Sequence, residues 1–161
     1  MNRPWHIFIV EDNEKYSMML DYVLSKDNNY RFIRLSSGED CIKNLHLDPD
    51  IIILDYGLPG MNGYETLLNI KTIKPNVHVI TLTNNTDHIL EVKLKAAGSD
   101  HHVFKQGHGE RQVIEKVEHF INEKERAAFE EVEEMKRTRI KKLAVLVGMM
   151  VLATLGCYLI F

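Results

Sequence analysis

The aspartate at position 55 directly follows four consecutive large apolar residues, Ile51 to Leu54. An apolar run that is short and rich in β-branched side chains is typical of a strand buried on both faces, as in parallel sheets. Asp55 is therefore expected at the carboxyl end of a central strand, where open α/β sheets place their ligands and their chemistry. A carboxylate in that position serves as a nucleophile, as a metal ligand, or as both.

Four further polar residues end other apolar runs of the chain. They are Glu11 and Asp12 after residues 5–10, Thr83 after residues 77–82, and Lys105 after residues 101–104. Because the carboxyl ends of parallel strands meet at one edge of a sheet, these side chains are expected near Asp55. Three carboxylates in one pocket repel each other, and Mg²⁺, which prefers oxygen ligands, would relieve that repulsion.

The elements that must position these residues alternate along about the first 120 residues. Apolar runs predict strands at 5–10, 30–35, 51–54, 77–82 and 101–104, and helical patterns predict helices at 14–25, 39–47, 63–73 and 86–97 and from about 109. Strands that alternate with helices of about ten to fifteen residues indicate βαβ units and a parallel sheet. Pro49 and Pro75 precede strands, and Gly98 follows the fourth helix, in agreement with this register.

Over residues 5–121 the chain resembles a response-regulator receiver domain of two-component signalling, the family that includes the chemotaxis protein CheY. The acidic pair, the D-x-x-L-P-x-M-N-G run from Asp55, the T-L-T strand end and the A-G-S-D…F-K segment occur in the family's order and spacing. The resemblance implies an α/β fold of the flavodoxin-like (βα)5 type, with a five-stranded parallel sheet in the order 2-1-3-4-5. It also implies a signalling protein that catalyses only its own phosphoryl transfer and dephosphorylation.

The resemblance assigns a role to each polar strand-end residue. It implies that Asp55 is the phosphoacceptor, and that Lys105 pairs with the phosphoryl group. It implies that Thr83 hydrogen-bonds the phosphoryl group and acts in switching. The implied ligands of Mg²⁺ are Glu11, Asp12, Asp55 and the backbone carbonyl of Gly57. The implied donor is a histidine kinase or a phosphotransfer protein in a phosphorelay, and the implied output is a contact with another protein.

Three positions depart from the family's pattern. Gln106 follows Lys105 where most receivers have proline, which disfavours the family's cis peptide. His102 stands at the switch position that usually carries Tyr or Phe, so that coupling to the output face is expected to be altered or pH-dependent. Asn84, after Thr83, replaces a residue that is usually small, and it is expected to narrow the access of the phosphodonor to the site.

The end of the chain has a different composition. Residues 122–142 are strongly charged and predict a helical linker, and residues 143–161 contain no charged residue. This predicts three parts: a receiver at 1–121, the linker at 122–142, and a transmembrane helix from Leu143 to Phe161. The basic residues just before Leu143 predict a single-pass anchor in the inner membrane with the receiver in the cytoplasm. Small residues at 144, 148 and 156 predict weak homodimerisation of that helix.

Two other functions stay open at this point. The formal charge of −3 gives no indication of nucleic-acid binding. One alternative is a constitutive membrane-tethered scaffold, a pseudo-receiver that binds a partner with little dependence on phosphate. The other is a phosphatase of the haloacid-dehalogenase type, which is disfavoured because those enzymes usually need a second aspartate where this chain has Gly57.

Overall fold

The computed structural model describes residues 3–26 and 29–158, with side chains in the last helix described to residue 150 and at residue 152. The strands are β1 (Trp5–Val10), β2 (Tyr30–Leu35), β3 (Ile51–Asp55), β4 (His78–Thr83) and β5 (His101–Phe104). The helices are α1 (Glu14–Leu24), α2 (Gly38–Asn44), the 3₁₀ turn η1 (Leu45–Leu47), α3 (Gly63–Ile73), α4 (His88–Ala96) and α5 (Gly109–Tyr158).

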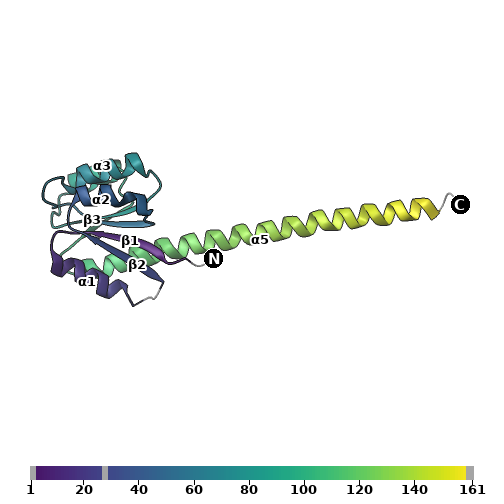
Figure 1. The fold of residues 1–161 in the computed structure, drawn as a ribbon, viewed down its shortest axis with the longest axis horizontal. Helices are drawn as coiled ribbons and strands as arrows, with labels where there is room; N and C mark the ends of the chain where they lie inside the picture. The colour runs from purple at the N-terminus through teal and green to yellow at the C-terminus, as the bar shows by residue number, and fades with distance from the viewer. Residues whose placement is uncertain (1–2, 27–28, 159–161) are drawn as a thin grey trace. The chain divides into compact units, whose positions relative to one another are not determined.

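The five strands form one parallel sheet in the order β2-β1-β3-β4-β5. Helices α2 and α3 cover one face of the sheet, and α1 and the beginning of α5 cover the other (Figure 1). This confirms the expected flavodoxin-like arrangement. Since the order turns back at β1, the carboxyl ends of β1 and β3 flank the crevice in which such sheets bind ligands.

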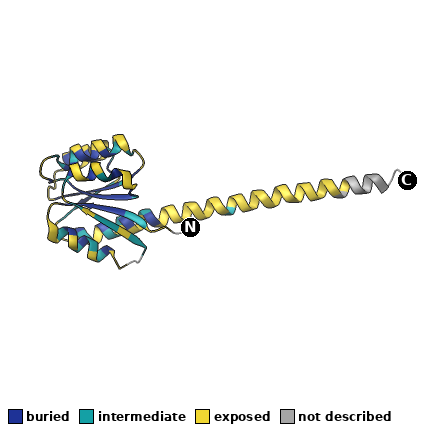
Figure 2. Ribbon diagram, in the orientation of Figure 1, coloured by how far each residue is buried: buried dark blue, intermediate teal, exposed yellow. Residues whose placement is uncertain are grey.

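The central strands are buried on both faces, as their composition predicts. The exposed fraction of Ile51, Ile52, Ile53 and Leu54 is 0%, and β1 is fully buried from Ile7 to Val10 (Figure 2). One layer of the core joins strand residues such as Phe8 and Val79 to residues of α2, α3 and α4. A carboxylate at the end of such a strand is therefore held by a rigid, close-packed support.

The turn after β3 is fixed by local chemistry. The side chain of Asn62 accepts a hydrogen bond from the backbone N–H of Glu65, and the Glu65 side chain accepts one from the backbone N–H of Asn62, which forms a capping box at the start of α3. A Cβ placed on Gly63 would lie 2.2 Å from the backbone oxygen of Asp55. Only glycine allows α3 to begin this close to the end of β3.

The chain divides into two compact units between Glu118 and His119, so that the boundary falls within helix α5. In the first unit, Val113 and Val117 are buried. In the second unit, the side chains of residues 122–142 are exposed except for that of Glu133, which is half-buried. The predicted linker is thus helical throughout.

The expected membrane anchor from Leu143 to Phe161 is wrong. Within the described part of the chain, no helix combines the length and the apolar character needed to cross a membrane. Residues 159–161 of the predicted span lie outside the described residues, and the predicted localisation in the inner membrane is withdrawn.

Candidate functional site: an acidic pocket with a buried lysine

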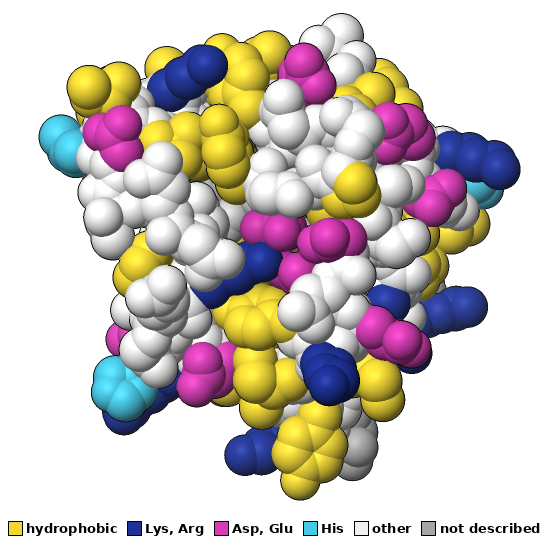
Figure 3. Space-filling model, turned by 90° about the vertical axis from the view of Figure 1, so that its left-hand side faces the viewer, with side chains coloured by type: hydrophobic (Ala, Val, Ile, Leu, Met, Phe, Trp, Pro, Cys, Tyr) yellow, Lys and Arg dark blue, Asp and Glu magenta, His cyan; other side chains and the backbone are white. Residues whose placement is uncertain are grey.

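A cavity of about 610 Å³ opens at the carboxyl edge of the sheet. It brings together every residue for which the sequence predicts a role in metal binding or phosphoryl transfer. Its lining consists of Glu11, Asp12, Asn13, Asp55, Tyr56, Gly57, Thr83, Asn84, Asn85 and Lys105. On the face of the molecule seen in Figure 3, acidic side chains gather beside a basic one near the centre.

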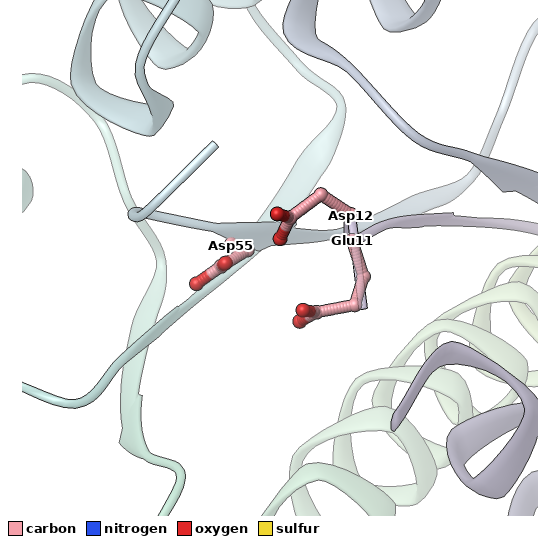
Figure 4. Close-up of side chains that lie close together, drawn as sticks. All are labelled: Glu11, Asp12 and Asp55. Carbon is pink, nitrogen blue, oxygen red and sulfur yellow. The ribbon is translucent and has the colours of Figure 1, made fainter. Parts of the chain in front are cut away.

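Three carboxylates form the negative side of the pocket. Asp55 projects from the end of β3, and Glu11 and Asp12 project from the segment after β1, so that their carboxylates share one space (Figure 4). One oxygen atom from each lies within 4.8 Å of the others. Glu11 and Asp55 are buried, whereas Asp12 is exposed. Oxygen ligands at this spacing, with one side open to water, fit Mg²⁺, which keeps several of its waters when it binds to proteins.

Lys105 supplies the positive charge. Its Nζ lies 2.6 Å from Oε2 of Glu11 and 2.9 Å from Oδ1 of Asp55. Burial raises the pKa of Glu11, although the hydrogen bond from Lys105 acts in the opposite direction. The lysine thus partly offsets the mutual repulsion of two buried carboxylates.

Thr83 is the last residue of β4 and is buried. Its hydroxyl oxygen accepts a hydrogen bond of 3.0 Å from the backbone N–H of Asn85. Its backbone oxygen accepts a bond of 2.8 Å from the backbone N–H of Lys105. The hydroxyl hydrogen remains available to a group in the cavity, and the backbone bond holds the ends of β4 and β5 together.

Gly57 contributes backbone to the wall of the cavity. A Cβ at this position would lie 3.5 Å from Oδ2 of Asp55, which is ordinary van der Waals contact. The Lys105–Gln106 peptide bond is trans, since the described chain contains no cis peptide. This agrees with the effect expected of Gln106.

His102 lies in β5 and is not among the residues that line the cavity. Its Nδ1 is 3.3 Å from Oγ1 of Thr81, which is also 2.9 Å from Oγ of the buried Ser99. Burial lowers the pKa of His102, and the negative charge of Glu91 opposes that effect. The residue at the predicted switch position therefore joins a polar cluster behind the site.

Sequence reasoning missed four residues at the pocket: Asn13, Tyr56 and Asn85 in its lining, and Tyr16 beside it. Asn13 caps α1 and donates its backbone N–H to Oε1 of Glu11. Asn85 lines the rim. Tyr16, on α1, places its ring 5.0 Å from Nζ of Lys105.

The comparisons with known proteins agree with this geometry. The sequence model described as the response regulator receiver domain matches residues 7–118. The chain therefore belongs to the response-regulator receiver family. Receivers of this family accept a phosphoryl group on an aspartate and bind Mg²⁺ at an acidic pocket, and Glu11, Asp12 and Asp55 form an acidic cluster in this chain.

Two curated relatives illustrate the sequence similarity. The transcriptional regulatory protein AfsQ1 of Streptomyces coelicolor is 32% identical over 104 residues, which cover 64% of this chain and 45% of that protein. The sporulation initiation phosphotransferase F of Bacillus subtilis is 32% identical over 78 residues, which cover 48% of this chain and 62% of that protein. The chain thus spans less than two thirds of either relative.

Solved structures show the same fold. The response regulator DrrB of Thermotoga maritima has a TM-score of 0.68 at 26% identity, covering 75% of this chain and 54% of that one. A CheY-like receiver domain protein of Methanospirillum hungatei has a TM-score of 0.69 at 21% identity, covering 77% of this chain and 98% of that one.

Proposed function

We propose that this chain is a response-regulator receiver that accepts a phosphoryl group on Asp55 from a histidine kinase or a phosphotransfer protein. The observation that carries the proposal is the position of Lys105, whose Nζ lies 2.9 Å from Oδ1 of Asp55 in a pocket with two further carboxylates. Phosphoryl transfer depends mainly on positioning and on neutralising charge, and this pocket offers both.

Each side chain has a specific task in this proposal. A carboxylate oxygen of Asp55 attacks the phosphorus, the bond from phosphorus to the donor histidine nitrogen breaks, and the donor nitrogen keeps the bonding electrons. Lys105 moves from Asp55 towards the new phosphoryl oxygens, and the Thr83 hydroxyl donates a hydrogen bond to one of them. Glu11, Asp12, Asp55 and the backbone carbonyl of Gly57 would hold Mg²⁺, which supplies positive charge to the transferring group.

The remaining parts of the chain are assigned accordingly. We propose residues 1–121 as the receiver and residues 122–142 as a helical linker. The output is a contact with a protein, and a second copy of this chain is one such partner. With a formal charge of −3, nucleic acid is not expected as a partner. His102 and Thr83 are proposed to connect the phosphoryl group to the output face.

The proposal is tested with the full chain, Mg²⁺ and acetyl phosphate, followed by mass spectrometry of the intact protein and of its peptides. One phosphoryl group on Asp55 is expected. Asp55→Asn should remain unmodified, and Asp48→Asn, which changes an exposed carboxylate elsewhere, should be modified like the wild type. If the wild type gains no mass where a known receiver does, the proposal fails. A downstream partner that binds wild type and Asp55→Asn equally would favour the constitutive scaffold.

A further inference from the structure

The ammonium group of Lys105 has an uncharged neighbour as well as two charged ones. The ring of Tyr16 lies with its centroid 5.0 Å from Nζ of Lys105, within the range in which a cation is attracted to an aromatic ring. The lysine side chain is 10% exposed, so the contact is largely shielded from water. Such contacts are stronger at desolvated sites than at exposed ones.

The three neighbours of Lys105 differ in what happens to them during the reaction. Glu11 and Asp55 both belong to the carboxylate cluster that fits a divalent cation, and Asp55 is the proposed phosphoacceptor. Their interactions with the lysine must weaken when a metal ion or a phosphoryl group arrives. Tyr16 carries no charge and offers no carboxylate, so its contact with Lys105 can persist through both events.

The hydroxyl group of Tyr16 is enclosed by protein. It is buried and makes no hydrogen bond to any residue within the described ranges. A Cβ placed on Gly109, at the start of α5, would lie 3.6 Å from that hydroxyl oxygen. Burial and the negative charges of Glu11, Glu110 and Asp55 raise the pKa of Tyr16 to about 12, so the hydroxyl stays protonated. The ring, and not the hydroxyl, provides the useful contact.

The backbone that follows Lys105 provides less support. Residues 106–108 form a turn with exposed side chains, and Gly107 has a φ of +80°. The lysine therefore depends on its side-chain neighbours to keep its ammonium group in the cavity.

We infer that Tyr16 is a positioning residue for phosphoryl transfer, whose ring holds Lys105 in the pocket while the lysine changes partners from Asp55 to the phosphoryl group. The inference rests on the proposed function, because it assigns to Lys105 a role in the phosphorylation of Asp55. Tyr16 does not touch the reacting atoms and acts through the lysine.

The test measures the rate at which acetyl phosphate modifies the full-length protein at saturating Mg²⁺. Tyr16→Leu should react roughly three- to tenfold more slowly, the effect expected when a partly desolvated cation–π contact is lost. Tyr16→Phe keeps the ring and should react like the wild type. Tyr22→Leu, at a residue on the same helix that is 75% exposed, is the matched control and should also react like the wild type.

A double-mutant cycle separates positioning from a general structural effect. In a Lys105→Ala background, Tyr16→Leu should cause no further loss of rate, because the ring has no ammonium group left to hold. The affinity for Mg²⁺, measured by titration, should change less than twofold in Tyr16→Leu, since Tyr16 offers no carboxylate to the metal. Equal rates for wild type and Tyr16→Leu, or an equal loss in the Lys105→Ala background, would overturn the inference. If the wild type itself is not phosphorylated, the proposed function fails instead.

Discussion

The ammonium group of Lys105 donates a hydrogen bond of 2.6 Å to Oε2 of Glu11, a residue 94 positions earlier in the chain. The exposed fractions of the two side chains are 10% and 1%. A buried ion pair of this kind adds little to stability as a pair, but removing one partner leaves an uncompensated charge. Here it leaves two carboxylates, because Asp55 shares the same lysine.

Replacing Lys105 with methionine should therefore destabilise the fold. We expect Lys105→Met to lower the free energy of unfolding by about 3 kcal/mol in the absence of Mg²⁺, the usual cost of breaking a buried pair. Urea unfolding followed by the fluorescence of Trp5, the one tryptophan of the chain, measures this. Lys95→Met, at an exposed position of α4, is the control and should change little. A stability equal to that of the wild type would show that the lysine's own desolvation cancels its attraction to the carboxylates.

Mg²⁺ should stabilise the folded chain through the carboxylate cluster. A ligand that binds only the folded state at ten times its Kd contributes about 1.4 kcal/mol. Asp12→Asn should lose most of this gain, because one of the three carboxylates is removed. The measurement is the shift of Tm with added MgCl₂, and Asp40→Asn, at an exposed residue of α2, should shift as far as the wild type does. Equal shifts in both variants would place the metal elsewhere.

His102 should make stability depend on pH. Burial lowers its pKa from the ordinary value of 6.5. Between pH 6.5 and that lowered pKa, the unfolded chain binds a proton that the folded chain does not. The contribution of His102 to the free energy of unfolding is therefore complete above pH 6.5, and it is lost as the pH falls from 6.5 through the lowered pKa.

The comparison that isolates this effect is Tm from pH 8 to pH 5 for wild type and His102→Phe. The Tm of His102→Phe relative to that of the wild type should rise as the pH falls, because only the wild type loses the contribution of His102. His88→Phe, at an exposed residue of α4, serves as the control and should keep the pH dependence of the wild type. Parallel profiles for wild type and His102→Phe would contradict the prediction.

Gly63 should not tolerate a side chain. The Cβ of an alanine would lie 2.2 Å from the backbone oxygen of Asp55 and 2.5 Å from Cα of Tyr56, so backbone would have to move. We expect Gly63→Ala to cost at least about 2 kcal/mol, the range of forced overpacking. The same unfolding assay applies, with Gly148→Ala as a control in α5, where the added Cβ meets nothing within 4 Å. Unchanged stability of Gly63→Ala would mean that the start of α3 can shift freely.

The strands could be predicted because each is a short apolar run between turn residues, and four of the five begin at the expected residue. The ends of the helices depend on capping hydrogen bonds, which the apolar pattern does not specify. Helix α4 begins at His88, because the Asp87 side chain accepts a hydrogen bond from the backbone N–H of Ile89. The sequence offers several adjacent residues able to cap there. Helix α2 passes into the 3₁₀ turn Leu45–Leu47, whose C-cap residue Asp48 lies in the left-handed region, a change that apolar periodicity does not reveal.

The site was predictable wherever it depends on strand ends. Asp55, Thr83 and Lys105 meet because parallel strands share one edge. Tyr16 was not predictable in this way, since its contact depends on the rotation of α1 and on the path of the residues after β5. The cluster of Thr81, Ser99 and His102 likewise depends on contacts between side chains that are distant in sequence. The membrane anchor was inferred from composition alone, and no helix of the described residues combines the length and the apolar character that a membrane span requires.

The contact between Glu11 and Lys105 also sets a condition on biosynthesis. As the chain emerges from the ribosome, Asp55 appears well before Lys105, so the proposed phosphoacceptor is made before the cation that pairs with it. A nascent or truncated chain that ends before β5 carries the aspartate without a complete pocket. If Asp55 is the phosphoacceptor, as we propose, its reactivity requires that synthesis has passed β5, and we expect unfinished chains to react poorly with a phosphodonor.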